Sequence, residues 1–346
     1  MKVTLLPGDT ATHEQSARIL QHITNHWVSC CVYAAAKLNI ADLLATGPQS
    51  ITSLAGATAT HPPSLYRLLR LLAANDLFEE ISPEIFDNTA ASTALISDIK
   101  GGMKEFVLAE LGEFYLPWGN LVDSIRTGKT AFDEYYGGNL WDFYKTHQAE
   151  GLNFMKAMTN LTQFSEGAIL ERYDFSAFST ITDVGGGNGA LLMAILKRTP
   201  EARGIVFDEP YVVKETAHLI AADPKVKDRC ATAGGNFFVE VPAGADAYVI
   251  KYILHDWSDE DAIRILSNCS RAMKKDSKIL VIDGVVPEGN APHASKLMDM
   301  NMLALTGGRE RTAAEFESIF LRSGLRLTRV IDLSISEVSI VEGKKV

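Results

Sequence analysis

The chain has 346 residues, of which 47% are hydrophobic and 22% are charged, and its net charge is −10. This length allows two or three domains with a sizeable core. The acidic balance argues against nucleic-acid binding, which needs clustered cations. No apolar run reaches transmembrane length, and residues 1–7 are too short for the apolar region of a signal peptide. We therefore expect a cytoplasmic protein that binds neither nucleic acid nor membrane.

The four cysteines, Cys30, Cys31, Cys230 and Cys269, lack the spacing of metal ligands. The adjacent Cys30 and Cys31 suit buried small hydrophobic residues better than a disulfide. We expect reduced thiols and no bound metal.

The first hundred residues show helical periodicity followed by a turn. The predicted elements are helices at 12–45, 50–55 and 62–74 and a hairpin at 78–86. Helices followed by a hairpin resemble a winged helix, a fold often associated with DNA. Only Arg67 and Arg70 are basic on the candidate recognition helix. An interaction module that pairs with a second copy is therefore favoured over DNA contact.

Residues 102–173 are predicted to be helical, with breaks at Pro117 and at Gly137-Gly138. This segment is rich in Phe, Tyr, Trp and Met. Most of these side chains must form core, and some could line a cavity for a flat aromatic ligand, because ligand pockets are mostly apolar.

From residue 180 onward, strands alternate with helices, a pattern typical of an α/β fold. Strands are predicted at 180–184, 204–208, 228–232, 246–250, 278–283, 325–332 and 335–342, and helices at 189–198, 210–221, 259–273 and 312–323. The last two strands are too close in sequence for a parallel crossover. The sheet should therefore end in an antiparallel pair, which disfavours an all-parallel nicotinamide-binding domain.

A glycine-rich turn, Asp183-Val-Gly185-Gly-Gly187-Asn-Gly189, ends the first of these strands. Glycines at a strand-to-helix turn let a ligand approach the backbone, and the helix that follows offers unpaired N–H groups. Asp208, at the end of the next strand, is placed to accept hydrogen bonds from a ribose. These features predict a nucleoside-binding unit. Gly185-x-Gly187-x-x-Ala190 also satisfies a relaxed dinucleotide pattern, so the glycines alone leave the nucleoside open.

A second polar group, Lys251-Tyr-Ile-Leu-His255-Asp256-Trp257, follows the strand at 246–250. His255 is expected on a loop at the carboxyl end of a strand, where ligands bind in open α/β sheets. A histidine in this place could equally cap a helix or pack, and the residues alone leave both interpretations open.

Several motifs occur together in the order of one family: Asp183–Gly189, Phe207-Asp208, Gly235–Phe238, Lys251, Leu254–Glu260 and Gly307–Thr312. The chain resembles the O-methyltransferases that include plant caffeic acid and hydroxyindole (acetylserotonin) enzymes and bacterial natural-product relatives. These enzymes are class I methyltransferases that use S-adenosylmethionine (SAM). The resemblance covers nearly the whole chain.

The resemblance implies a Rossmann-like mixed α/β sheet whose last strand is antiparallel, preceded by a winged-helix-like domain that forms a homodimer. The implied division is a dimerisation domain at 1–100, a helical connector and substrate-pocket region at 101–172, and a SAM-binding catalytic domain at 173–346.

The resemblance also implies that His255 is the general base and that the acids Asp283 and Glu310 flank it. Such acids make physical sense, because a carboxylate fixes the imidazole tautomer and stabilises the imidazolium. Taken alone, Asp283 would more often be a turn acid, and Glu310 an acid near a helix start.

The implied cofactor-binding residues are Asp183, Gly185, Gly187, Asp208, Asn236, Phe237, Lys251 and Thr162. The family usually has Asp at the position of Asn236, directed at the adenine amino group. Asn keeps a carbonyl acceptor, so the cost should be about 1 kcal/mol or less. The implied substrate residues are Phe154, Met158, Asp256, Asn301 and Met302. Core packing suits Phe154 and the two methionines nearly as well.

The expected reaction moves the sulfonium methyl of SAM to a hydroxyl of a small phenolic, indolic or polyketide-like acceptor and leaves S-adenosylhomocysteine (SAH). A phenol near pKa 10 facing a histidine near 6.5 leaves a gap of roughly 3.5 units, or about 5 kcal/mol. Two alternatives are a relative that methylates nitrogen or uses SAM without methylating, and a non-enzymatic regulator. The combination of His255, Asp283 and Glu310 favours O-methylation.

Overall fold

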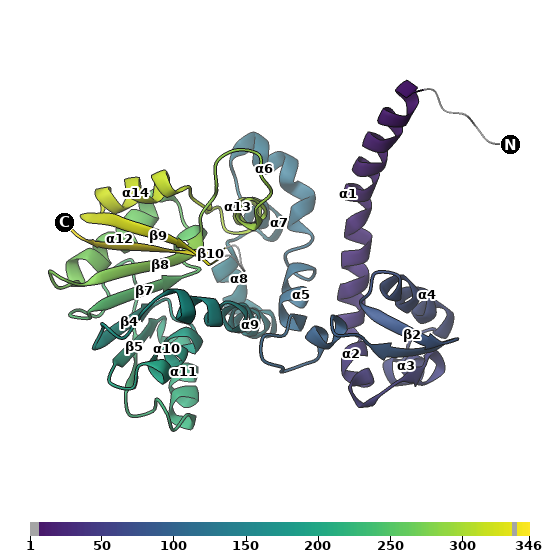
Figure 1. Cartoon of the computed structure of the whole chain (residues 1–346), viewed down its shortest axis with the longest axis horizontal. Helices are drawn as coiled ribbons and strands as arrows, with labels where there is room; N and C mark the ends of the chain where they lie inside the picture. Colours follow the sequence, from purple (N-terminus) through teal and green to yellow (C-terminus); the bar gives the residue numbers. More distant parts are fainter. Residues whose placement is uncertain (1–6, 334–337) are drawn as a thin grey trace. The chain divides into compact units, whose positions relative to one another are not determined.

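The computed structural model describes residues 7–333 and 338–346, with side chains from residue 13 onward. The chain forms two compact units that divide between Glu113 and Phe114 (Figure 1). The expected division into three parts at residues 100 and 172 stays a prediction.

The first unit combines helices with a small antiparallel sheet. Its elements are α1 (Pro7–Lys37), α2 (Ile40–Leu43), η1 (Leu44–Thr46), β1 (Gln49–Ser50), α3 (Ile51–Thr58), α4 (Pro62–Ala73), β2 (Phe78–Ser82), β3 (Ile85–Asn88), η2 (Ser92–Leu95) and α5 (Lys104–Glu110). The strand order is β1-β3-β2. The hairpin of β2 and β3 confirms the predicted one, whereas β1 is too short for its sequence to reveal.

The helical character predicted for 12–45 is confirmed, but the segment is divided into α1, α2 and η1. Helix α1 ends at Lys37, and Asn39 adopts a left-handed backbone with φ 56°. A non-glycine residue in this conformation cannot continue an α-helix, so the chain turns into the short α2 and η1. Ser50 then caps α3 by accepting a hydrogen bond from Ser53 N. Among the described residues no single helix could cross a membrane by length and apolarity, and one bent pair, His13–Lys37 with Ile40–Thr46, meets those criteria jointly.

The second unit begins with helices and continues into a seven-stranded mixed sheet. The helical part contains η3 (Pro117–Asn120), α6 (Leu121–Thr127), α7 (Ala131–Tyr136), α8 (Leu140–Thr146) and α9 (Gln148–Arg172). The break at Gly137 falls where it was predicted, whereas the break predicted at Pro117 lies before it, at residues 111–116, and Pro117 begins η3. Gly137 ends α7 with φ 76°, a backbone conformation that glycine adopts at little cost.

The rest of the second unit, which contains the sheet and the helices that pack on it, follows α9. Its elements are β4 (Thr180–Val184), α10 (Ala190–Arg198), β5 (Arg203–Asp208), α11 (Pro210–Ala222), β6 (Cys230–Gly234), β7 (Ala247–Lys251), η4 (Leu254–Asp256), α12 (Asp259–Ala272), β8 (Lys278–Gly284), α13 (Ala294–Leu305), α14 (Ala313–Arg322), β9 (Leu325–Asp332) and β10 (Val338–Lys345). Of the strand predicted at 335–342, residues 335–337 lie outside the described residues. Strand β6 starts two residues later than predicted, because residues 226–229 form a turn closed by Cys230 N and Val226 O at 2.9 Å.

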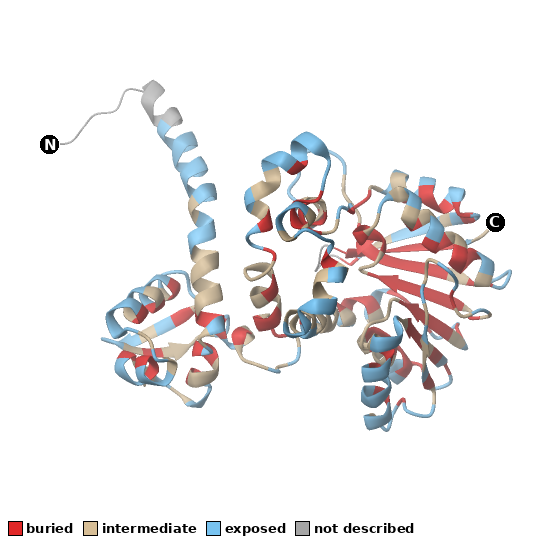
Figure 2. Ribbon diagram, turned by 180° about the vertical axis from the view of Figure 1, so that it is seen from behind, coloured by how far each residue is buried: buried red, intermediate tan, exposed pale blue. Residues whose placement is uncertain are grey.

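The strand order is β6-β5-β4-β7-β8-β10-β9, with the first five strands parallel and β10 antiparallel to both neighbours. This confirms the predicted antiparallel end of the sheet. Figure 2 shows the strands as buried and the helices around them as exposed on their outer faces. Apolar residues of α9 and α10 pack on one face, and those of α12 and α14 pack on the other. Burial on both faces explains the continuous apolar runs of the parallel strands.

Glu342, on β10, is a buried acid with four side-chain partners. It accepts hydrogen bonds from Tyr173 Oη at 2.7 Å, Lys278 Nζ at 2.9 Å, Thr328 Oγ1 at 2.7 Å and Arg329 Nη2 at 3.0 Å. Burial alone would raise its pKa, but these hydrogen bonds lower the pKa to about 2. The acid therefore joins the end of α9 to the strands β8, β9 and β10.

We expect Glu342→Gln to lower the free energy of unfolding by about 2 kcal/mol at pH 7, because it weakens hydrogen bonds to a buried charge. The folded-state pKa lies below the usual 4.5. The stabilisation is therefore present above pH 4.5 and is lost as pH falls toward 2. Urea unfolding from pH 3 to 7 measures this slope, with the exposed Glu317→Gln as control. Equal slopes in the wild type and Glu342→Gln would contradict the assignment.

Candidate active site

The candidate cofactor residues and the candidate catalytic acid Asp283 lie along one edge of the sheet. This edge is formed by the carboxyl ends of its five parallel strands. Gly185 follows β4, Asp208 ends β5, Asn236 follows β6, Lys251 ends β7 and Asp283 lies near the end of β8. Because the parallel strands point the same way, their carboxyl ends meet at this edge, which is the ligand-binding edge of open α/β sheets.

The glycine-rich turn adopts a backbone that only glycine takes readily. Gly185, Gly187 and Gly189 have φ of 70°, 55° and 76°. A Cβ on Gly185 would lie 2.4 Å from Ile253 Cδ1, whereas a Cβ on Gly187 would meet open space. A side chain at Gly185 would therefore clash with Ile253. At Gly187 no protein atom lies within 4 Å of the position that a Cβ would take.

Asp208 holds the turn from the neighbouring strand. Its Oδ2 accepts a hydrogen bond from Gly187 N at 2.8 Å, and its Oδ1 accepts one from Glu209 N at 2.7 Å. Burial raises the pKa of Asp208, and these two N–H donors oppose the rise. Asp183 is fully buried behind the turn, where burial and then the charge of Asp208 raise its pKa to about 7. Asp208 is half-buried, whereas Asp183 is buried.

The remaining candidate cofactor residues surround this turn. Lys251 is 8% exposed, donates to Thr162 Oγ1 on α9 at 3.2 Å, and lies 3.6 Å from the centre of the Tyr252 ring. Asn236 Oδ1 accepts from Phe238 N at 2.8 Å, so it caps its own loop while keeping a second lone pair. The Phe237 ring approaches the position that a Cβ on Gly185 would take, at 3.8 Å. The structure therefore brings the candidate cofactor residues together.

His255 lies in η4 among three acids and is 6% exposed. Its Nδ1 is 2.8 Å from Glu310 Oε1, and its Nε2 is 3.8 Å from Asp256 Oδ1. Asp283, fully buried, acts on the imidazole electrostatically. The Glu310 contact fixes the ring so that Nε2 is the nitrogen available to a ligand.

Tyr252 contacts both His255 and Asp283, which the sequence did not indicate. It adopts a left-handed backbone with φ 54°, and its N–H donates to Asp283 Oδ1 at 2.8 Å. Its ring stacks on the His255 imidazole, with centroids 5.5 Å apart and planes 19° apart. Such a conformation is uncommon for an aromatic residue and often marks a functional site.

The acids determine the protonation of His255. Burial alone would lower its pKa, but the charges of Glu310 and Asp256, the hydrogen bond to Glu310 and the charge of Asp283 raise it to about 10. Burial also raises the pKa of Asp256, to about 6, and that of Asp283. Asp283 Oδ2 and Glu310 Oε2 are buried and accept no hydrogen bond from the described part of the chain. The cluster therefore retains protons at neutral pH.

The candidate substrate residues lie on α9 and α13, except for Asp256. Phe154 packs edge-on against Phe114 and Trp141 and stacks on Tyr144. Met302 is buried and contacts Thr306, and Asn301 is 9% exposed. For Phe154 and Met302 these contacts account for packing in the aromatic helical region, so their roles toward a substrate stay predictions. The same holds for Met158, which is half-buried.

Arg311 is the other residue whose place the sequence did not indicate. The motif Gly-Gly-Arg309-Glu310-Arg311-Thr contains two arginines, and only Arg311 is fully buried. Their spacing in the sequence does not show which of the two arginines is buried, because the burial of Arg311 depends on contacts with the distant turn after β7. Among the described residues, no group of three or more His, Cys, Asp or Glu side chains is arranged to hold a metal ion.

A model of the O-methyltransferase domain matches residues 118–326, more than half of the chain, and a model of the O-methyltransferase dimerisation domain matches residues 20–98. The chain belongs to this family of SAM-dependent methyltransferases. Similar relatives include phenazine O-methyltransferase PhzM of Lysobacter antibioticus, 41% identical over 96% of both chains. The mitomycin biosynthesis 6-O-methyltransferase of Streptomyces lavendulae is 35% identical over 97% of this chain and 96% of its own. A phenazine-1-carboxylate N-methyltransferase of Pseudomonas aeruginosa is 31% identical over 94% and 96%.

Solved structures agree with this membership. The crystal structure of LaPhzM superposes with a TM-score of 0.92 at 41% identity, covering 96% of this chain and 99% of that one. The calicheamicin biosynthesis methyltransferase CalO1, with SAH bound, gives 0.84 at 35%, covering 96% and 98%. NcsB1, an O-methyltransferase from neocarzinostatin biosynthesis in complex with SAM and 2-hydroxy-5-methyl naphthoic acid, gives 0.79 at 32%, covering 92% and 96%. The family thus includes both O- and N-methyltransferases of aromatic compounds.

We expect Glu310→Gln to lower the pKa of His255 by about one to three pH units, because it removes the carboxylate bound to Nδ1. In the wild type the folded-state pKa, about 10, exceeds the usual 6.5. The pairing therefore stabilises the fold fully below pH 6.5 and ceases to do so as pH rises through 10. NMR titration of ring-labelled histidine measures the pKa. Glu317→Gln is the control, since Glu317 is exposed on α14. An unchanged pKa in Glu310→Gln would show that the pairing is absent.

Proposed function

We propose that the protein transfers a methyl group from SAM to a hydroxyl of a small aromatic natural product, with His255 as the general base. The observation that carries the proposal is the pairing of His255 Nδ1 with Glu310, which leaves Nε2 for an acceptor at the edge of the sheet. The relatives with O-methyltransferase names, and the naphthoic acid bound to NcsB1, support an aromatic hydroxyl as acceptor.

The residues at the sheet edge fit SAM. Asp208 supplies a carboxylate for ribose hydroxyls, Asn236 and Phe237 supply a polar and an aromatic group for adenine, and Lys251 adds a buried cation. The open side of Gly187 leaves room for a ligand against the backbone. When bound, SAM supplies an electrophilic methyl group on a sulfonium.

The acids around His255 bring its proton affinity closer to that of a phenol. An ordinary histidine has a pKa near 6.5, whereas the three acids raise the pKa of His255 to about 10. A phenol has a pKa near 10, so the rise makes proton transfer from oxygen to Nε2 less costly than it is for an ordinary histidine. At pH 7 the resting imidazole carries a proton. The reacting pair, neutral imidazole with phenol or imidazolium with phenolate, therefore becomes more abundant as pH rises.

N-methylation is the second candidate. It is favoured by the similarity to two N-methyltransferases, the phenazine-1-carboxylate N-methyltransferase and the 8-amino-8-demethylriboflavin N,N-dimethyltransferase. An aromatic ring nitrogen has no proton to lose on methyl transfer, so the placement of His255 among three acids favours a hydroxyl over a ring nitrogen. An exocyclic amine does lose a proton, and product analysis distinguishes it from a hydroxyl.

We expect His255→Gln to bind SAH with unchanged affinity and to lose turnover by about 100-fold or more, the usual contribution of a general base. Purified protein is incubated with methyl-labelled SAM and matched pairs of hydroxyl and amino aromatics, including hydroxyphenazines and naphthols, and products are identified by mass spectrometry. Calorimetry with SAH controls for folding, and the exposed His218→Gln controls for loss of a histidine. Methylation of nitrogen only, or full turnover by His255→Gln, would overturn the proposal.

We also propose that the protein is a homodimer that associates through the first unit. The match of residues 20–98 to the dimerisation domain supports this assignment. Helix α1 presents an apolar stripe whose side chains are 58–62% exposed: Ile19, Leu20, Ile23 and Trp27. Figure 2 shows the outer part of this helix as exposed. An apolar stripe of this kind needs a partner surface.

We expect the double variant Ile23→Asp and Trp27→Asp to shift the protein from dimer to monomer, because two charges cannot be buried in an apolar contact without partners. Sedimentation equilibrium measures the mass. Leu321→Asp, which changes a 55%-exposed leucine on α14, is the matched control and should remain dimeric. A dimer of unchanged stability in the double variant would rule out α1 as the contact.

A further inference from the structure

Arg311 is a fully buried cation one residue from the acid that binds His255. Its exposure is 0%, which is rare for arginine and requires that its donors be satisfied internally. The guanidinium does not contact the imidazole. Its partners show what it does instead.

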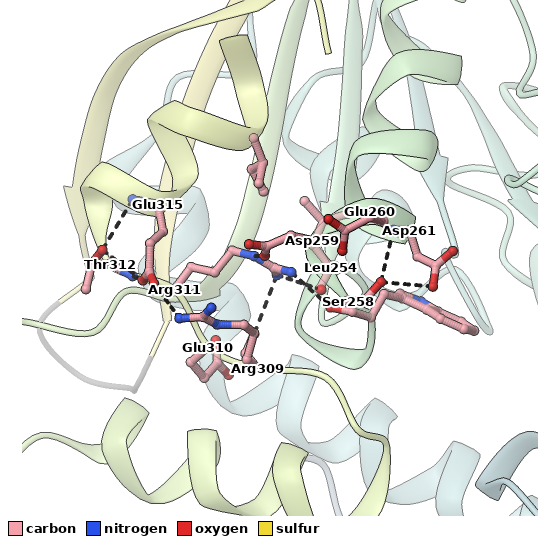
Figure 3. Close-up of polar contacts among 12 residues, drawn as sticks. Leu254, Ser258, Asp259, Glu260, Asp261, Arg309, Glu310, Arg311, Thr312 and Glu315 are labelled. Atoms are coloured by element: carbon pink, nitrogen blue, oxygen red, sulfur yellow. Dashed lines mark hydrogen bonds and ion pairs between the residues drawn. The ribbon is translucent and has the colours of Figure 1, made fainter. Parts of the chain in front are cut away.

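The guanidinium binds both ends of the turn that carries His255. Arg311 Nη1 donates to Leu254 O at 2.8 Å, and Nη2 donates to Trp257 O at 2.9 Å. Its Nε donates to Asp259 Oδ1 at 2.9 Å, at the start of α12 (Figure 3). The planar, forked guanidinium suits two acceptors in fixed positions, whereas a lysine ammonium offers a single point charge.

The backbone of residues 308 and 309, just before Arg311, also contacts the turn that carries His255. Arg309 N donates to His255 O at 2.8 Å. A Cβ on Gly308 would lie 2.0 Å from His255 O and 2.6 Å from Trp257 N, so only glycine fits there. The segment 308–312 thus touches the turn through its backbone as well as through Arg311.

The segment 308–312 is itself anchored. Glu310 N donates to Asp299 Oδ1 on α13 at 2.9 Å, and Val286 N, just after β8, donates to Arg311 O at 2.9 Å. Directly after Arg311, Thr312 and Glu315 form a capping box at the start of α14, and Arg309 pairs with Glu315 (Figure 3). Glu310 lies inside this anchored segment, so its carboxylate has little freedom to follow a displaced imidazole.

We infer that Arg311 is a positioning residue that fixes the η4 turn against segment 308–312 and so holds His255 Nδ1 on Glu310. The inference rests on the proposed function for its effect on turnover, but the geometry of the imidazole can be measured without an acceptor. Arg311→Lys keeps the charge and cannot reach both carbonyls together. The turn then moves relative to Glu310.

The control is an arginine of the same kind elsewhere in the unit. Arg229 donates to Leu196 O at 2.9 Å, Ala202 O at 2.7 Å, Thr199 O at 3.1 Å and Lys225 O at 2.9 Å. It lies just before β6, at the end of the strands opposite to His255. Arg229→Lys therefore loses a comparable set of carbonyl contacts without affecting the turn.

The experiment follows the ring signals of His255 by NMR from pH 6 to 10.5 in the full-length protein, together with SAH calorimetry. The titratable groups that face the imidazole are Asp256, Asp283, Glu310 and the stacked Tyr252. We expect the titration midpoint of His255 to fall by about one pH unit or more in Arg311→Lys, as for loss of a close charge partner. It should not change in Arg229→Lys. Where an acceptor is found, kcat should fall by about tenfold or more with KM for SAM unchanged, as expected for lost positioning.

An unchanged His255 midpoint in folded Arg311→Lys overturns the inference, as does an equal shift in Arg229→Lys. If Arg311→Lys does not fold, the neutral Arg311→Gln provides the test, since its amide can reach one of the two carbonyls but not both and leaves no unpaired buried charge. An unchanged midpoint in folded Arg311→Gln then overturns the inference. Absence of methyl transfer by the wild type would refute the proposed function while leaving the NMR result valid for Arg311.

Discussion

The buried contact between His255 and Glu310 is the interaction on which the rest of the site depends. Both side chains are almost inaccessible, and a charge in such a place is tolerated only when it is paired. The 2.8 Å contact joins two segments that are 55 residues apart. It therefore exists only because the loop after β7 and the segment before α14 meet at the edge of the sheet.

Three acids surround the His255 imidazole and together raise its pKa. Glu310 fixes the ring, Asp283 binds the backbone of Tyr252, and Asp256 lies on the side of Nε2. Each carboxylate raises the proton affinity of the imidazole, and burial strengthens the effect by excluding water. The result is an imidazole whose pKa lies well above its usual 6.5.

The candidate cofactor residues and the His255 cluster meet at strand β7. The first group lies at the ends of β4, β5 and β6 and includes Lys251 at the end of β7, whereas the His255 cluster lies on the loop after β7, on β8 and before α14. Helix α9 reaches the first group, since Thr162 accepts a hydrogen bond from Lys251. The names of the relatives give different acceptors on this one scaffold.

The sequence by itself determined the α/β class, the antiparallel end of the sheet and the family, because glycine turns, apolar strands and short connections are local features. It also supplied His255, Asp283 and Glu310 as candidates, through ordered motifs rather than through any one residue. Tertiary structure alone decided which arginine of the Gly307–Thr312 motif is buried, that Tyr252 stacks on His255, and that the acids raise the pKa of the imidazole. These properties depend on contacts between distant segments and on the exclusion of water. The break of α1 at Asn39 is likewise a left-handed backbone that helical periodicity does not encode.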